Sequence, residues 1–557
     1  MFSLMEISKL EVIDALVGHL EDSGIKHVFG FPGESTLPLY QAYKARKGIE
    51  HVMAGCERCA GYMADVYARI TNTIGVVDSP GGIGSPWLIP AICEAQNSST
   101  PLLAIVSGVS TSKTEKWTTH ESPQQELFQP ITSKTLRLEN PDRLFDFLRI
   151  LFSAAAGNQP GPVMLEIPTD IMQREVQPAR STSIITYPTH RSVPADENIQ
   201  TAVEVIRNSR RPIILAGGGI HSSQAYEAIK GFSTKFHIPV ATSINGKGTI
   251  DEASELSLGV VGNKGTTSAN DFFRTRDLAI VIGSKLGDKT TDQYRLFPDG
   301  MPIVRIEIDS DEIRRNFDSE IALVGDARET VRRLLTFTLP DFFDEESVRA
   351  IKEIKRIIAQ KYAQLELPNS PVCPSFIIKQ INKKFDGRAI ICADASVASG
   401  WVGALGLSRG GKRNIVTPRG TGSLGFGFPA TLAAKIASPD TPVFGIGGDA
   451  GFAMSVHEIE TACRLGLDVH YFVLNNGALG LLESHLEASG AKDVLDKRHP
   501  TNWEAIAKGF GAKGITLNTN GEVGEYFENL HKGPAIVQVM VNEDVVAPDF
   551  ETVSNSQ

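Results

Sequence analysis

The chain has 557 residues, 41% of them hydrophobic, and a formal net charge of −10. This length is enough for about three domains of ordinary size. Acidic and basic residues are mixed without a basic tract, which argues against nucleic-acid binding, and no apolar run is long enough to span a membrane.

Helical and strand patterns alternate over the first part of the chain. We expect helices at 8–22, 36–45 and 57–70, and strands at 27–30, 50–53, 73–77, 101–107 and 161–167. Alternation of this kind predicts a doubly wound sheet of parallel strands. Residues 1–180 are therefore predicted to form one domain, and the polar, proline-containing stretch 177–196 is predicted to be a linker.

The rest of the chain repeats this alternation twice. A middle domain over 190–340 has strands expected at 212–216, 277–283 and 302–309. A charged helical connector at 341–374 leads to a third domain over 365–557, with strands expected at 389–394, 441–446 and 469–474. The predicted fold class is α/β, with three doubly wound parallel-sheet domains.

Two features of the sequence bear on cellular location. Residues 1–9 lack the charged and apolar regions of a signal peptide. The six cysteines lie mostly in apolar segments, as reduced thiols do. We therefore expect a cytoplasmic protein.

Polar residues follow two strands of the third domain. The strand at 441–446 leads into Gly447-Gly448-Asp449-Ala450-Gly451, and the strand at 469–474 ends at Asn475-Asn476. Between them we expect one helix over 455–466, with Ser455 as its N-cap and Gly466 as its C-cap.

The ends of neighbouring parallel strands meet at one edge of a sheet, where ligands bind. A carboxylate and an amide oxygen suit Mg²⁺, and glycine N–H groups with a helix N-terminus suit a phosphate. The pattern therefore predicts a clip for a metal ion and a diphosphate. The alternative is a glycine-rich turn followed by an Asx turn.

This clip resembles the thiamine-diphosphate (ThDP) motif, in which Gly-Asp-Gly is followed downstream by a pair of asparagines. Ala450 replaces the second glycine of the motif, and a methyl group there is acceptable if φ is negative. The resemblance implies that Mg²⁺ takes Asp449, Asn476 and the backbone carbonyl of Ala478. It further implies that the cofactor contacts Gly448, Asp449, Ala450, Gly451, Asn476, Ala478 and Leu479.

Two segments of the first domain resemble the acetolactate synthase and pyruvate decarboxylase group of ThDP enzymes. The turn from Gly30 to Glu34 resembles their opening turn and places Gly33 near the cofactor. Residues 55–69 resemble their His-Glu-x-x-Ala segment, with Cys56 in place of the histidine and Glu57 at the catalytic glutamate. In the family this glutamate hydrogen-bonds the aminopyrimidine ring of the cofactor. Without the resemblance, Glu57 reads as a carboxylate that stabilises a helix N-terminus.

Two further acid–base candidates follow from position alone. Counted back from Pro130, His120 falls where acetolactate synthases carry an active-site glutamine, and its pKa near neutrality suits proton transfer. Glu34 takes the place of an aspartate in pyruvate decarboxylases. The alternatives are a solvated loop histidine and a solvated turn glutamate.

The third domain has one more strong match. Residues 419–429 resemble the Gly-x-Met-Gly-x-Gly-x-Pro segment of acetolactate synthases, which implies that Leu424 supports the bent cofactor and that the Gly422 carbonyl accepts from the aminopyrimidine. Ser396 opens a helix close to where the family binds diphosphate. The alternative for 419–429 is a glycine-rich turn that opens a helix.

The middle domain resembles the flavin domain of acetolactate synthase at 245–248, 258–265 and 308–313. Lysines at 285 and 289 stand where that family has arginines, and many relatives keep the domain without FAD. FAD is therefore a possible cofactor, with a non-redox role if bound, and the sequence leaves the question open.

Nearly the whole chain resembles the acetolactate synthase, pyruvate oxidase and benzaldehyde lyase branch of ThDP enzymes. The three domains would then be, in order, a pyrimidine-binding domain, a central Rossmann-like domain, and a domain that binds the diphosphate and its metal. The branch implies a homodimer or homotetramer with the active site at the subunit interface. It also implies small 2-oxo acid or carbonyl substrates.

The expected reaction is 2-oxo acid decarboxylation with carboligation. The alternatives are a simple 2-oxo acid decarboxylase, a C–C lyase or hydrolase acting on a diketone or acyloin, and, from another class, a non-catalytic homologue. Leu482 stands where pyruvate decarboxylases carry a glutamate that protonates the enamine, which favours carboligation. Intact Glu57, Asp449 and Asn476 argue against a non-catalytic role. The sequence does not identify the donor or the acceptor.

Overall fold

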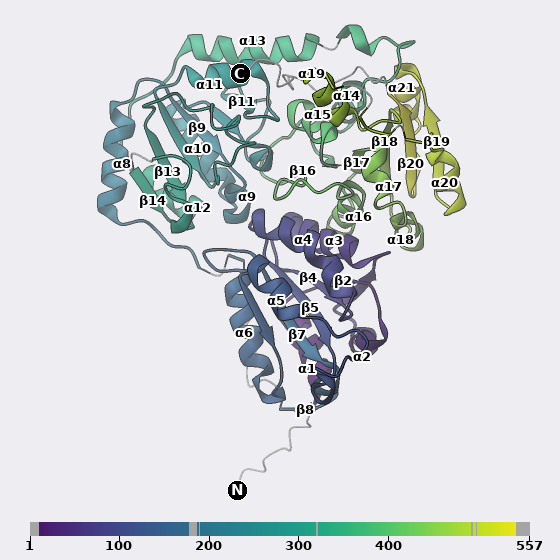
Figure 1. Ribbon diagram of the computed structural model, residues 1–557. Helices are drawn as coiled ribbons and strands as arrows, with labels where there is room; N and C mark the ends of the chain where they lie inside the picture. The colour runs from purple at the N-terminus through teal and green to yellow at the C-terminus, as the bar shows by residue number, and fades with distance from the viewer. Residues whose placement is uncertain are drawn as a thin grey trace. The chain divides into compact units, whose positions relative to one another are not determined.

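The computed structural model describes residues 10–177, 187–188, 190–318, 321–361, 363–491, 494–496 and 498–541. The expectations for residues 1–9 and for most of the 177–196 linker fall outside these ranges. The chain divides into an N-terminal unit, Met1–His190, and a C-terminal unit, Arg191–Gln557 (Figure 1). Within the described ranges, no helix combines the length and the apolar character needed to cross a membrane.

The N-terminal unit contains one six-stranded sheet of parallel strands in the order β3-β2-β4-β5-β7-β6. Its strands are β2 (His27–Gly30), β3 (Glu50–Met53), β4 (Gly75–Ser79), β5 (Leu102–Gly108), β6 (Lys134–Arg137) and β7 (Pro162–Pro168). Its helices are α1 (Val12–Asp22), α2 (Leu37–Lys44), α3 (Glu57–Thr71), α4 (Gly84–Asn97), α5 (Gln124–Phe128), α6 (Leu144–Ala155) and α7 (Thr169–Met172).

Apolar side chains of α1, α2 and α6 pack on one face of this sheet, and α3 and α4 pack on each other and against β2 and β4. The expected helix at 8–22 begins only at Val12, because β1 (Leu10–Glu11) pairs antiparallel with β8 (Glu175–Val176).

The C-terminal unit contains two more six-stranded parallel sheets. The central sheet has the order β11-β10-β9-β12-β13-β14, with β9 (Pro212–Ala216), β10 (Val240–Thr242), β11 (Ser257–Val260), β12 (Leu278–Ile282), β13 (Ile303–Glu307) and β14 (Ile321–Val324). One face is covered by α8 (Asp196–Asn208), α9 (Gly219–Ser223), α10 (Tyr226–Phe236) and α12 (Ala327–Leu334). The other is covered by α11 (Thr267–Arg274) and α13 (Glu345–Lys361).

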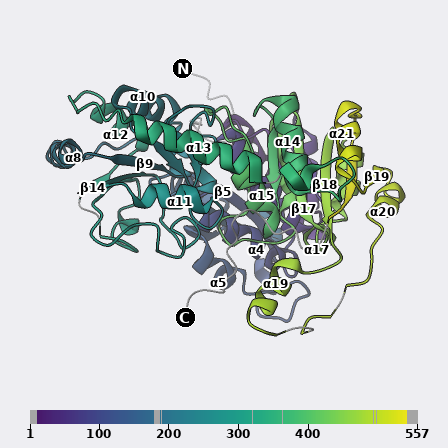
Figure 2. The same cartoon turned by 90° about the horizontal axis from the view of Figure 1, so that it is seen from above.

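Helix α13 is the expected charged connector, and Figure 2 shows it running from the central sheet toward α14 (Pro374–Phe385). The last sheet has the order β16-β15-β17-β18-β20-β19, with β15 (Ile390–Ala393), β16 (Ile415–Val416), β17 (Val443–Gly448), β18 (Val469–Asn475), β19 (Lys513–Leu517) and β20 (Ala535–Met540). Its helices are α15 (Val397–Leu405), α16 (Gly427–Ala437), α17 (Asp449–Ala453), α18 (Glu458–Arg464), α19 (Gly480–Ala488), α20 (Trp503–Gly509) and α21 (Asn520–Glu528).

The three parallel sheets confirm the predicted fold class. One local expectation is wrong: two short helices, α17 and α18, follow β17 where a single helix was expected. Ser455 does not cap α18, because the helix begins at Glu458 after His457, and the Ser455 carbonyl accepts the Glu458 N–H inside the intervening turn. At the other end the C-cap residue is Leu465, and Gly466 follows it with the left-handed φ of +59° that stops a helix.

All three six-stranded sheets share one topological feature. Strand β2 lies between β3 and β4, strand β9 lies between β10 and β12, and strand β15 lies between β16 and β17, so the chain reverses its winding direction at these strands. Ligands of doubly wound sheets bind in the crevice at the carboxyl ends of the strands at such a point. The topology therefore marks the loops after β2 and β4, those after β9 and β12, and those after β15 and β17.

Glycines let buried side chains approach these strand ends closely. A Cβ added to Gly447 would lie 2.1 Å from the hydroxyl of buried Tyr471, whereas one added to Gly448 would meet nothing within 4 Å. Gly447→Ala is expected to destabilise the fold by about 1–3 kcal/mol through overpacking. This corresponds to about 2–4 °C in the thermal-unfolding midpoint for each kcal/mol.

Gly448→Ala is the matched control and is expected to leave the midpoint nearly unchanged. Adding Tyr471→Phe to Gly447→Ala is expected to recover part of the loss, because the atom that clashes is the hydroxyl oxygen. Equal losses for the two glycine variants would contradict this account of the strand end.

Candidate cofactor and active site

Asp449 and Asn476 follow two neighbouring strands of the last sheet. Strands β17 and β18 pair Gly448 with Leu474, so Asp449 and Asn475 are the next residues at the same edge. Buried Asp449 accepts the Ala450 N–H on Oδ1 at 2.8 Å, and Asn476 accepts the Ala478 N–H on its amide oxygen at 3.2 Å. The amide nitrogen of Asn475 instead donates to the Thr501 carbonyl at 3.5 Å. Of the asparagine pair, Asn475 is therefore hydrogen-bonded to a distant part of the chain, whereas Asn476 bonds within its own turn.

The second carboxylate oxygen of Asp449 lies 3.5 Å from the Arg498 guanidinium. Burial raises the pKa of Asp449, and the charge of Arg498 opposes that rise. A carboxylate and an amide oxygen at adjacent strand ends form a donor set that suits Mg²⁺. Gly477, with φ of +66°, turns the chain so that Ala478 and Leu479 follow at the same edge.

A second carboxylate, Asp394, organises the floor of this crevice. Its Oδ1 accepts the Ala395 N–H at 2.7 Å, and its Oδ2 accepts the Gly425 N–H at 3.1 Å. Added Cβ atoms on Gly451 and Gly427 would lie 2.4 Å and 2.9 Å from Asp394 side-chain atoms. Burial raises the pKa of Asp394 to about 6, against the effect of these backbone donors.

Asp394 thus joins the exit of β15, the glycine-rich segment 419–427 and helix α17. Sequence reasoning missed it, although an acidic residue ending a buried strand beside a glycine-rich segment was a usable signal.

The remaining predicted residues of this crevice lie on its loops. Ala450 lies inside α17, so its φ is negative and its methyl group is accepted, as expected. Gly422 is exposed with φ of +73°, and Leu424 is 39% exposed. Ser396 immediately precedes α15, and Leu479 immediately precedes α19. All of them follow strand ends at the same edge of the sheet.

In the N-terminal unit, the predicted residues converge on the turn at 80–84, which follows β4. A Cβ added to Gly84 would lie 2.8 Å from Glu57 Oε1, and one added to Gly33 would lie 2.6 Å from Pro80 Cβ. A Cβ added to Gly82 would lie 2.5 Å from His120 Cα. Glu57, Gly33 and His120 therefore surround one turn. Glu34 follows Gly33 and is exposed, as is His120, whose φ is +70°.

Glu57 is the first residue of α3 and is 7% exposed. Burial raises the pKa of Glu57, so its carboxyl group holds a proton more readily than a carboxyl in water does. A buried carboxyl whose proton affinity is raised can exchange hydrogen bonds with a ring nitrogen in either direction.

Buried polar networks that the sequence did not reveal support this crevice. The Tyr40 hydroxyl donates to Asp78 Oδ1 at 3.0 Å, and His51 Nε2 lies 2.8 Å from Asp78 Oδ2. Burial and then Asp78 raise the pKa of Tyr40. In a second network, Ser107 Oγ accepts the Gly81 N–H at 2.8 Å and lies 2.7 Å from Ser35 Oγ. These contacts tie the loops after β2 and β4 to the end of β5.

Comparison with protein families gives three matches along the chain. Residues 10–130 match the N-terminal TPP binding domain of thiamine pyrophosphate enzymes, residues 199–334 match their central domain, and residues 394–539 match their C-terminal TPP binding domain. The chain belongs to the thiamine pyrophosphate (ThDP) enzyme family. Each of the two crevices lies in a TPP-binding domain, so ThDP is the cofactor that the family assigns to them.

Several curated relatives that match nearly the whole chain are acetolactate synthase large subunits. The chain is 29% identical to the acetolactate synthase large subunit of Corynebacterium glutamicum, over 95% of this chain and 86% of that protein. It is 28% identical to the probable acetolactate synthase large subunit of Methanocaldococcus jannaschii, over 96% and 92% of the two chains. It is also 28% identical to the acetolactate synthase isozyme 1 large subunit of Escherichia coli, over 96% and 94%.

The glycine turn of this ThDP enzyme's central domain, 217–219, is closed by its own neighbours. The Gly217 and Gly219 N–H groups donate to the carbonyls of Ile282 and Gly283, both at 2.9 Å. A Cβ on Gly217 would lie 2.1 Å from the Gly283 oxygen. These two N–H groups are therefore not open to a phosphate, and FAD remains an untested alternative.

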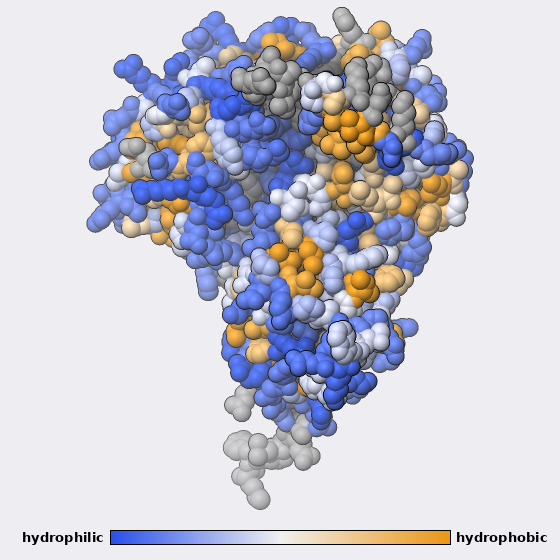
Figure 3. Space-filling view, in the orientation of Figure 1, coloured by the Kyte–Doolittle hydropathy of each residue, from blue (hydrophilic) through white to orange (hydrophobic). Residues whose placement is uncertain are grey.

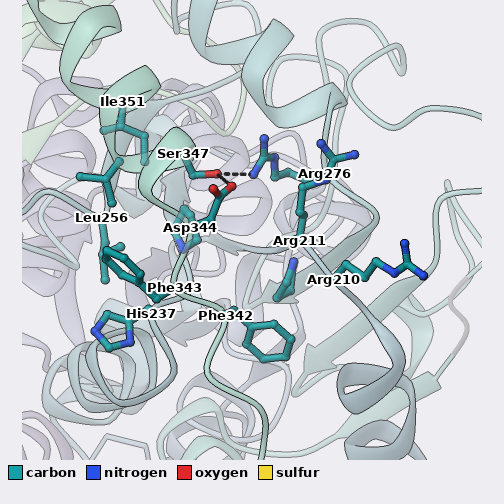
Figure 4. Close-up of a pocket in the computed structure, with 13 residues that line it drawn as sticks. Arg210, Arg211, His237, Leu256, Arg276, Phe342, Phe343, Asp344, Ser347 and Ile351 are labelled. Carbon is teal, nitrogen blue, oxygen red and sulfur yellow. Dashed lines mark hydrogen bonds between the residues drawn. The ribbon is translucent and has the colours of Figure 1, made fainter.

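A small pocket of the central domain lies at the opposite, amino ends of the strands (Figure 4). Arg276 points to Ser347 and donates to its hydroxyl at 2.7 Å, and Ser347 donates to Asp344 at 2.6 Å. The enclosed space is about 10 Å³, which is room for about one water molecule. This pocket anchors α13 to the central sheet and is not the ThDP site.

Asp394→Asn tests the organising role of this carboxylate. The amide of asparagine keeps one acceptor oxygen, but its NH₂ group faces either the Ala395 N–H or the Gly425 N–H, which then has no acceptor. An unsatisfied buried donor costs about 1–3 kcal/mol. We expect a lower unfolding midpoint and weaker ThDP binding by calorimetry. Asp440→Asn, which changes a loop carboxylate that is exposed, is the control. Unchanged stability and binding in Asp394→Asn would contradict the role.

Proposed function

We propose that this chain is a ThDP- and Mg²⁺-dependent carboligase that decarboxylates a 2-oxo acid and joins the remaining fragment to a second carbonyl compound, as an acetolactate synthase does. The observation that carries the proposal is the pair of polar strand-end sites in the two TPP-binding domains. One presents a buried glutamate, and the other presents an aspartate beside an asparagine. The names of the relatives favour the acetolactate-type reaction.

The residues take the following roles in this proposal. Asp449, Asn476 and the Ala478 carbonyl hold Mg²⁺, and the diphosphate lies against Ser396, Gly448, Ala450 and Gly451. Glu57 holds a proton at the aminopyrimidine ring, which the Gly422 carbonyl, Leu424, Leu479 and Gly33 position. When bound, ThDP supplies a carbon nucleophile and takes up the electrons released by decarboxylation. His120 and Glu34, both exposed at the crevice of the N-terminal unit, exchange protons with the substrate.

Exposed apolar side chains at both crevices support self-association. Phe31, Leu37, Ile83 and Trp87 are exposed in the N-terminal unit, and Leu424, Met454 and Leu482 are exposed in the C-terminal unit. On the face that Figure 3 shows, apolar atoms form separate patches in a mainly hydrophilic surface. Apolar patches beside a binding site are typical of surfaces that another subunit covers, whereas scattered single apolar side chains are normal. We therefore include a homodimer or homotetramer with the active site at the subunit interface.

Leu482 bears on the fate of the decarboxylated fragment. It lies on α19, the helix that follows the metal-binding loop, and is 50% exposed. An apolar side chain here supplies no proton, which favours carboligation over simple decarboxylation. The domain divisions 1–180, 190–340 and 365–557 and the cytoplasmic location remain predictions.

The reaction is tested by incubating the protein with ThDP, Mg²⁺ and ¹³C-labelled pyruvate and identifying the products by NMR. Acetolactate or acetoin is the expected result. Acetaldehyde alone would replace the proposal with a simple decarboxylase. No turnover, with ThDP nevertheless bound, would exclude pyruvate as the donor and direct the assay to other 2-oxo acids, diketones and acyloins.

Glu57→Gln tests the catalytic carboxyl. Loss of a positioned acid–base group is expected to lower kcat by about 10²- to 10⁴-fold, while ThDP binding measured by calorimetry stays close to the original. Glu50→Gln changes an exposed carboxylate on the preceding strand and is expected to alter kcat by no more than about twofold. Full activity in Glu57→Gln would remove Glu57 from the proposal.

Asp449→Asn tests the metal site. The variant is expected to need a much higher Mg²⁺ concentration for ThDP binding, because a neutral amide attracts a divalent cation less than a carboxylate does. The unfolding midpoint of the cofactor-free variant is expected to stay the same or rise, since burial already disfavours the charged form of Asp449. Unchanged Mg²⁺ dependence would place the metal elsewhere.

A further inference from the structure

A lysine of the central domain reaches the start of α15 at the C-terminal crevice. Lys264 lies between β11 and α11, is 8% exposed, and its Nζ donates to the Ser396 carbonyl at 3.1 Å. Backbone packing reinforces this contact: a Cβ on Gly403 of α15 would lie 3.0 Å from the Lys264 carbonyl oxygen. The loop that carries Lys264 is therefore seated against the helix that Ser396 opens.

Ser396 has an unusual backbone conformation, with φ of +66° and ψ of −140°. Residues other than glycine adopt this region at a cost of about 1–3 kcal/mol and keep it only when their surroundings hold them there. Two donors hold the Ser396 carbonyl, Lys264 Nζ and the Ser399 hydroxyl at 2.8 Å. On the other side, the Ala395 N–H is fixed by Asp394. Hydrogen bonds thus hold the peptide groups on both sides of Ser396.

We propose that Lys264 is a positioning residue for cofactor binding, which holds the Ser396 carbonyl and thereby keeps the start of α15 in the conformation that receives the diphosphate. This inference rests on the assignment of the diphosphate to the C-terminal crevice in the proposed function. Released from the amine, the peptide after Ser396 rotates toward ordinary backbone angles and displaces the first turn of α15.

The surroundings of Lys264 are consistent with this role. Burial, followed by the nearby charges of Arg419 and Lys289, lowers the pKa of Lys264 to about 6. The amine carries N–H donors whether or not it is protonated, so the contact with Ser396 persists on either side of that pKa. Arg419 begins the glycine-rich segment 419–427, which Asp394 fixes through the Gly425 N–H. The lysine therefore links the central domain to the start of α15 and lies near Arg419 of the glycine-rich segment.

The test is a double-mutant cycle between Lys264→Met and Ser396→Gly, read out as the Kd for ThDP in the presence of Mg²⁺. Methionine matches the length of the lysine and removes the donor, and glycine adopts the Ser396 conformation freely. Lys264→Met is expected to weaken ThDP binding about tenfold. In the Ser396→Gly background, the same change is expected to weaken it by less than about twofold, because the backbone no longer needs the clamp.

Lys289→Met is the matched control, since it removes an exposed positive charge near Lys264 without touching Ser396. It is expected to leave the Kd unchanged. Ser399→Ala, which removes the other donor to the same carbonyl, is expected to weaken binding in the same direction as Lys264→Met and supplies the test if the latter fails to fold.

Two outcomes overturn the inference. One is a Kd in Lys264→Met equal to that of the unmodified protein. The other is an equal loss in both Ser396 backgrounds, which would show that Lys264 acts by another route. Because the readout is binding, a failure of the acetolactate-type reaction leaves this test intact, whereas absence of ThDP binding in the unmodified protein would refute the proposed function itself.

Discussion

The C-terminal crevice depends on one buried carboxylate. Asp394 accepts backbone N–H groups from the residue after its own strand and from the glycine-rich segment, while Gly451 and Gly427 pack directly against it. A carboxylate removed from water is costly unless its oxygens are satisfied, so this geometry fixes three loops at once. Asp449 is the first residue of α17, the helix whose Gly451 packs against Asp394. The fold therefore holds Asp449, one of the residues proposed to bind the metal, before any ligand arrives.

In the N-terminal unit, different groups hold the loops at the strand ends. Its crevice also lies where the sheet reverses its winding, but hydroxyl groups and a tyrosine–aspartate–histidine network hold its loops. Glu57 is buried beside the 80–84 turn, and its raised pKa follows from that burial. One crevice thus offers a carboxyl group that shares a proton, and the other offers anionic and amide oxygens for a cation. The two sheets belong to the two domains that match the TPP-binding domains of the family.

Much of the fold and part of the candidate site were predictable from the sequence, because they depend on local patterns of residues. The strands that precede Asp449 and Asn476 are short, mainly apolar runs, the first of them closed by glycines, and their parallel pairing follows from the helices between them. Capping at Ser455 was predicted wrongly, because a turn between α17 and α18 depends on packing that no local pattern encodes. Asp394, Lys264 and the Tyr40 network were missed because their partners are distant in sequence. The roles of His120 and Glu34 stay predictions, since both are exposed and their contacts depend on the substrate.

The central claim is that both strand-end crevices bind the same cofactor. Hydrogen–deuterium exchange of the whole protein, with and without ThDP and Mg²⁺, tests it most directly. The account predicts slower exchange at 33–36 and 80–84 in the N-terminal unit, and at 447–451 and 475–479 in the C-terminal unit. Slower exchange confined to one unit, or centred on the glycine turn at 217–219, would contradict it.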